Sequence, residues 1–133
     1  MGELLLFNIA DEEKKTAIRL TALRLGLSCR EIPAAWQAMT IGELLAGDVP
    51  EQPVPVEHPF TDELMLMHAL PQAEFHELLD TLRREGQSVR LKAVVTDYNR
   101  AWTALRLHRE LLAEEEAMKR WKQQSQTKKH KRK

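Results

Sequence analysis

The chain has little cysteine, few aromatic residues and no long apolar run, and each shortage narrows the class of protein. Its one cysteine, Cys29, has no partner for an intramolecular disulfide, which favours a reducing compartment. No stretch approaches the ~20 apolar residues that a membrane-spanning helix needs. Residues 1–8 lack the basic segment and long apolar segment of a signal peptide. We therefore expect a cytoplasmic protein that does not bind membranes.

Acidic residues are absent from the last part of the chain. All 20 of them lie at or before Glu116. Residues 1–118 hold 12 Lys and Arg, so their net charge is 12 − 20 = −8, whereas residues 119–133 hold eight Lys and Arg and no acid. The net charge of zero for the whole chain hides this division. We predict one acidic domain over residues 1–118 and a basic, disordered tail over residues 119–133.

Strand-like and helix-like patterns alternate along the acidic part. The expected strands are 3–9, 28–32, 63–69 and 91–95, and the expected helices are 12–25, a short one closed by Gly47, one from Pro71 to Gly86, and a long one from about Arg100. This order predicts an α/β fold with a four-stranded, mainly parallel sheet and helices packed on it. The alternative is a ferredoxin-like α+β fold, because the irregular stretch 33–60 allows two strands to be joined without a full helix.

Three segments resemble a bacterial family catalogued as domain of unknown function 3783. They are Leu-Leu-Leu-Phe-Asn-Ile at 4–9, Glu-Leu-Leu-Ala-Gly at 43–47, and Leu-Lys-Ala-Val-Val-Thr-Asp-Tyr-Asn-Arg-Ala-Trp-Thr at 91–103. The third carries the most specific match, through Lys92, Thr96, Asn99 and Trp102. The Asp-Tyr pair at 97–98 departs from the turn that is typical of the family. The resemblance covers roughly residues 3–118 and implies a fold but no activity.

Templates for catalysis and for cofactor or metal binding are missing. The first strand-to-helix turn, 8–12, has no glycine, so neither a phosphate-binding loop nor a dinucleotide fingerprint is present. There is no Gly-x-Ser-x-Gly motif, the five histidines lack metal-ligand spacing, and Cys29 in an apparent strand reads as an inert buried thiol. We predict no catalytic residue, metal or cofactor, which disfavours an enzyme without excluding one.

A polar cluster follows the fourth expected strand. Ligands bind parallel sheets at the carboxyl ends of the strands, where Asn8 would also lie. We predict a ligand site for an anion or a polar group from Lys92, Thr96, Asn99 and Arg100. The alternative is structural: Thr96 and Asn99 cap the next helix, and Lys92 forms a salt bridge or lies on an edge strand.

The basic tail has the strongest electrostatic signal in the chain. A dense run of cations binds nucleic acid through counterion release, and an aromatic ring among them stacks on bases. The expected nucleic-acid-binding residues are Lys119, Arg120, Trp121, Lys122, Lys128, Lys129, Lys131, Arg132 and Lys133. Our leading hypothesis is a non-enzymatic module that associates with RNA or a ribonucleoprotein through this tail.

Other hypotheses stay open at this point. The tail can instead be a solubilising end or a tether to the acidic domain, and Trp121 can be the last residue that docks the helix. The acidic domain can be a regulatory domain that senses an anion or nucleotide. A protein-interaction module that uses Trp36 and the proline-rich loop 48–60 is a further alternative. The sequence predicts no oligomeric state.

Overall fold

The computed structural model describes the backbone of residues 2–131 and the side chains of residues 2–124. Strands and helices alternate along it, as the sequence predicts. In chain order they are β1 (Glu3–Phe7), α1 (Glu12–Arg24), β2 (Ser28–Ile32), the 3-10 turn η1 (Ala34–Trp36), α2 (Ile41–Ala46), β3 (Leu64–His68), α3 (Gln72–Arg84), β4 (Leu91–Val94), η2 (Asn99–Ala101) and α4 (Ala104–Lys131). The α/β prediction with four strands is confirmed.

The sheet is mixed, in the order β2-β1-β3-β4. β1 and β2 are parallel, β3 and β4 are parallel, and β1 runs antiparallel to β3. Two of the three pairings are parallel, which agrees with a mainly parallel sheet. The ferredoxin-like alternative is wrong, because each helix that links β1 to β2 or β3 to β4 joins strands that are direct neighbours.

The two strand pairs belong to two similar units. Each unit contains a strand, a 13-residue helix and a second strand parallel to the first. In each unit the residue after the first strand has a positive φ, 59° at Asn8 and 57° at Ala69. Both helices end at a glycine with positive φ, Gly26 and Gly86. The antiparallel pairing of β1 with β3, centred on Leu5 and Leu66, relates the units by an approximate twofold axis.

The same axis relates the segments that follow the second strands. β2 leads into η1 and then α2, and β4 leads into η2 and then α4. Thr40 and Thr103 each precede a helix and accept a hydrogen bond from a backbone N–H of its first turn. The two threonines form an antiparallel bridge, in which the Ile41 N–H donates to the Trp102 carbonyl at 2.9 Å. The fold is therefore two copies of one β-α-β-α unit joined at the sheet and at this bridge.

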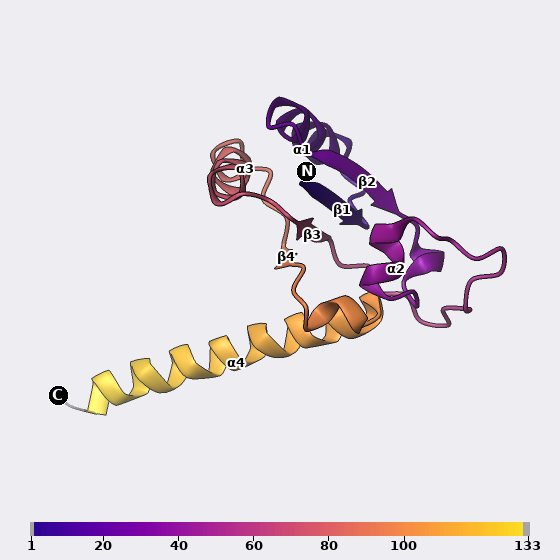
Figure 1. The fold of residues 1–133 in the computed structure, drawn as a ribbon. Helices are drawn as coiled ribbons and strands as arrows, with labels where there is room; N and C mark the ends of the chain where they lie inside the picture. The colour runs from indigo at the N-terminus through magenta and orange to yellow at the C-terminus, as the bar shows by residue number, and fades with distance from the viewer. Residues whose placement is uncertain (1, 132–133) are drawn as a thin grey trace.

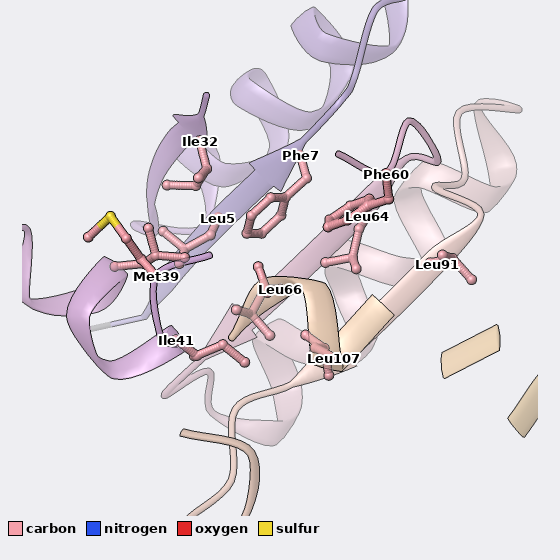
Figure 2. Close-up of a cluster of buried hydrophobic side chains, with 12 residues drawn as sticks. Leu5, Phe7, Ile32, Met39, Ile41, Phe60, Leu64, Leu66, Leu91 and Leu107 are labelled. Atoms are coloured by element: carbon pink, nitrogen blue, oxygen red, sulfur yellow. The ribbon is translucent and has the colours of Figure 1, made fainter. Parts of the chain in front are cut away.

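Helices cover both faces of the sheet, so the molecule has three layers (Figure 1). Side chains alternate along a strand, and the sheet therefore contributes to two cores. One core places Leu4, Leu6 and Met65 against α1 and α3. The other places Leu5, Phe7, Ile32, Met39, Ile41, Phe60, Leu64, Leu66, Leu91 and Leu107 between the sheet and the two segments that contain α2 and α4 (Figure 2). All four residues Leu4–Phe7 are buried, which explains why β1 reads as a continuous apolar run.

Helix α4 corrects two predictions about the C-terminal part. The helix begins at Ala104, after Thr103 rather than near Arg100. It also continues for 28 residues to Lys131, so residues 119–131 are helical instead of forming a disordered tail. The reason is local: no Gly or Pro follows Gly86, and Glu115 and Glu116 precede Lys119 and Arg120 by one helical turn, a spacing that stabilises helices. Residues 132–133 lie outside the described part.

Candidate functional site

A groove between the start of β4 and the middle of α4 unites residues from two different predicted sites. One wall contains Arg90, Leu91 and Lys92, and the other is α4. The groove has a volume of about 600 Å³, and its α4 residues are Leu111, Glu114, Glu115, Met118, Lys119 and Lys122. We call this the β4–α4 groove. It brings Lys92, predicted as a ligand contact, together with Lys119 and Lys122, predicted as nucleic-acid contacts.

Lys92 lies on an edge strand with its side chain in solvent. β4 is the last strand of the sheet, and Lys92 is exposed. Its ammonium donates a hydrogen bond to the Val89 carbonyl at 2.9 Å. This position matches the edge-strand alternative and explains how a charge is tolerated in an apolar strand. Leu91 and Ala93 pack in the core between the sheet and α4, so the Lys92 side chain points to the opposite face of β4, where it lines a pocket with residues of α3. Lys92 therefore only borders the β4–α4 groove.

A network of charged side chains holds α4 beside β4 at this groove. The Arg90 guanidinium donates to Asp62 at 2.6 Å and to Glu115 at 3.1 Å. The second Asp62 oxygen lies 2.8 Å from Nε2 of His108, whose ring stacks on Phe60 with centroids 4.3 Å apart. The hydrogen bond from His108, and then the charge of Arg90, lower the pKa of Asp62. The α4 wall of the groove is therefore held in place by contacts with Arg90, before β4, and with Phe60 and Asp62 of the preceding loop.

Thr96 and Asn99 have structural roles that account for their polar atoms. The Thr96 N–H donates to the Asn99 side chain at 2.9 Å, and the Asn99 N–H donates to the Thr96 hydroxyl at 3.1 Å. The Asn99 amide also donates to the Val94 carbonyl at 3.0 Å, on the edge strand. Asn99 is only 7% exposed. These two residues close the turn after β4 rather than capping α4, and they do not line the β4–α4 groove.

Arg100 is also separate from that groove. It is exposed, and its guanidinium lies 3.2 Å from Nε2 of His68, at the end of β3. Lys92 lies near the opposite end of β4, so the four predicted ligand residues do not form one site. Asn8 follows β1, which is antiparallel to β3, so it lies at the opposite end of the strands from Thr96 and Arg100. Its amide donates to the Phe60 and Asp62 carbonyls. The rule that places all strand ends together fails here, because it applies to a fully parallel sheet.

The distal half of α4 extends beyond the sheet into solvent (Figure 1). From Ala113 to Gln124 every residue except Glu115 is exposed. Met118 and Trp121 are 55% and 62% exposed, so Trp121 does not dock this helix on the domain. Lys119, Arg120 and Lys122 are exposed beside them. The side chains of Lys128, Lys129 and Lys131, and all of Arg132 and Lys133, lie outside the described residues.

The other two tryptophans pack against the core. Trp36 and Trp102 are partly buried against the cluster between the sheet and α4. The Arg106 guanidinium lies 4.5 Å from the centre of the Trp102 ring, over its face. Trp36 also lines a surface pocket with Val49 of the proline-rich loop, and its role in protein interaction stays a prediction.

Other chemistry is limited in the part of the chain that the structure describes. Burial raises the pKa of the Cys29 thiol, which makes it a weaker nucleophile at neutral pH. Among the described side chains, no group of three or more His, Cys, Asp or Glu is placed to hold a metal ion. No described helix combines the length and apolar character needed to cross a membrane.

Comparison with known proteins identifies one family. Residues 63–118 match the family model described as "Domain of unknown function (DUF3783)". This segment of the chain belongs to that family. The match covers the second unit, from the start of β3 into α4, and includes Lys92, Thr96, Asn99 and Trp102. It is shorter than the expected range of 3–118, and segments 4–9 and 43–47 lie outside it. Neither the curated proteins nor the solved structures contain a match.

Proposed function

We propose that the protein is a non-enzymatic, cytoplasmic module that associates with RNA or a ribonucleoprotein through the basic half of α4. The observation that carries this proposal is the extension of α4 past the sheet, with Lys119, Arg120 and Lys122 exposed beside Trp121. A helix displays its cations at fixed spacing, and each neutralised phosphate adds binding energy through counterion release.

The charge distribution supports the same proposal. Residues 1–118 have a net charge of −8, and residues 119–133 contain eight Lys and Arg. The acidic domain repels a polyanion, which directs it toward the end of α4 that lies farthest from the sheet.

Deletion of residues 123–133 tests the proposal. Binding of the full chain and of the truncated chain to a fluorescein-labelled RNA is measured by anisotropy at several salt concentrations. We expect the full chain to bind with a steep dependence on salt, and the truncated chain, which loses five of the eight cations, to bind more weakly with a shallower dependence. Equal binding by the two chains, or no binding by either, contradicts the proposal.

A second candidate function is a regulatory domain that binds an anion or nucleotide. The β4–α4 groove favours it, because Lys119 and Lys122 lie beside an apolar floor. A thermal-shift screen of inorganic phosphate and nucleotides tests this candidate, and a shift that Lys119→Ala leaves intact counts against the groove as the site.

A further inference from the structure

The β4–α4 groove combines features that suit one kind of nucleic acid. Its floor is apolar: Leu91 is buried, Leu111 is half-buried and Met118 is exposed. A phosphate chain alone makes no favourable contact with an apolar floor. A ligand that fills this groove therefore has a flat or apolar part in addition to its charge.

The rim of the groove is positive within an otherwise acidic domain. Arg90, Lys119 and Lys122 line it, against the carboxylates of Glu114 and Glu115, which gives a net charge of 3 − 2 = +1. Arg90 and Glu115 pair with each other at 3.1 Å. Lys119 and Lys122 thus face the ligand from the α4 wall of the groove. This arrangement is complementary to a phosphate backbone that passes along the rim.

Glu114 adds a selective element. A carboxylate repels phosphate, but it accepts hydrogen bonds from the amino and imino groups of an unpaired base. In an RNA duplex the imino groups are engaged in pairing, the amino groups lie in a deep, narrow major groove that side chains cannot read, and the base faces are covered by stacking. Only a single strand presents a base face, a base edge and phosphates to the three parts of this groove together.

Trp121 offers a second stacking surface next to the first. It lies three positions after Met118, on the neighbouring turn of the same face of α4, and is 62% exposed. Successive bases of a single strand stack on aromatic side chains that are arranged in this way.

We propose that the β4–α4 groove and Trp121 bind two neighbouring bases of single-stranded RNA, with Lys119 and Lys122 on the phosphates. This inference rests on the proposed RNA association and specifies the form of RNA that is bound.

Anisotropy with a labelled single-stranded RNA of mixed sequence, and with the same strand annealed to its complement, tests the inference on the full chain. We expect the single strand to bind more tightly than the duplex. Lys119→Ala, Met118→Ala and Trp121→Ala each weaken single-strand binding, Trp121→Ala by about 5-fold or more, the lower limit for loss of one stacked base. The same changes alter duplex binding by less than they alter single-strand binding.

Matched controls lie on the two helices of the other face. Leu23→Ala removes an apolar side chain that is 75% exposed on α1, and Arg83→Ala removes an exposed cation from α3. Neither change should weaken binding of the single strand. Circular dichroism checks that each variant is folded.

Two results overturn the inference while the proposed function stands: equal binding of single strand and duplex, or tight single-strand binding that Lys119→Ala, Met118→Ala and Trp121→Ala all leave unchanged. Absence of any RNA binding overturns both. Sedimentation equilibrium tests a further outcome, in which two copies of the chain associate through this face. A dimer that Met118→Glu dissociates, with RNA binding unchanged, assigns this face to contact between two copies and overturns the inference.

Discussion

Gln37 shows how one buried amide can fix a long loop. It is fully buried, and its amide donates to the Phe60 carbonyl at 3.0 Å, while the Phe60 N–H donates to its side-chain oxygen at 2.9 Å. Phe60 ends the proline-rich loop and stacks on His108, a residue of α4. The sequence contains no signal for this role, because Gln37 lies in an irregular segment and its partner is a backbone group 23 positions away.

Replacement of this amide should therefore destabilise the protein. Gln37→Leu keeps the size of the side chain but leaves the Phe60 N–H buried without an acceptor, since the Phe60 carbonyl keeps its bond from Asn8. We expect the free energy of unfolding to fall by about 1–3 kcal/mol. Urea denaturation followed by circular dichroism measures it. Gln52→Leu, in the exposed part of the same loop, is the control, with an expected change within about 0.5 kcal/mol. Equal effects of the two changes would contradict the assignment.

Asp62 makes the stability depend on pH in the acidic range. Its hydrogen bond with His108 and the charge of Arg90 lower its pKa in the folded state. Asp62 therefore stabilises the fold above the pKa that it has when unfolded, about 3.9, and this contribution is lost as the pH falls through the lower pKa of the folded state.

Asp62→Asn should accordingly lose less stability than the parent between pH 5 and pH 2, with each protein compared with itself at pH 7. The measurement is urea denaturation at stepwise lower pH. His108→Gln, which removes the hydrogen bond that does most to lower the pKa of Asp62, should flatten the profile in the same direction. Parallel profiles for all three proteins would show that this contact does not contribute.

At the scale of elements, local sequence signals predict where most helices and strands begin and end better than they predict the length of α4. The strand 28–32 is observed with the predicted limits, and Thr40 and Glu43 form the predicted capping box before α2. Gly47 ends that helix with a φ of 76°. These features depend on neighbours in the sequence, which is why a single sequence reveals them. The start of α4 was misplaced, because Thr96 and Asn99 resemble capping residues but bond to each other.

The distal half of α4 should be helical without contributing much to the stability of the domain. Ala117→Pro removes a backbone donor in the exposed part and breaks the helix there. We expect the helical circular dichroism signal to fall, while the thermal midpoint of the domain changes by no more than a few degrees. Ala117→Leu, which preserves helix propensity, is the control and should keep the signal. If residues 119–131 are not helical in solution, Ala117→Pro and Ala117→Leu will give the same signal.

At the scale of the whole molecule, the approximate twofold axis explains how the halves are held together. The contacts between them include the β1–β3 ladder, the Thr40–Thr103 bridge and the two buried clusters that both units share. The family match covers the second unit, and the first unit repeats its β-α-β-α order. The loop between them, residues 47–63, crosses from one unit to the other and contains no helix or strand.

Cleavage of that loop should leave the halves associated. A recognition sequence for a site-specific protease is inserted after Val54, which is 65% exposed, and the folded protein is cut. We expect both fragments to elute together in native buffer and to separate in denaturant, because the β1–β3 ladder and the apolar cluster do not depend on the loop. Separation in native buffer would show that the connection itself holds the units together.

The sequence by itself determined the order of elements, most of their limits, the absence of known catalytic templates and the division of charge at residue 118. These properties depend on composition and on residues a few positions apart. Only the tertiary structure decided that the strand pairs run antiparallel, that Thr96 and Asn99 close a turn, and that Lys119 and Lys122 lie beside Leu91 at one groove. The physical reason is that these relations depend on how the two units pack, and residues far apart in the chain set that packing.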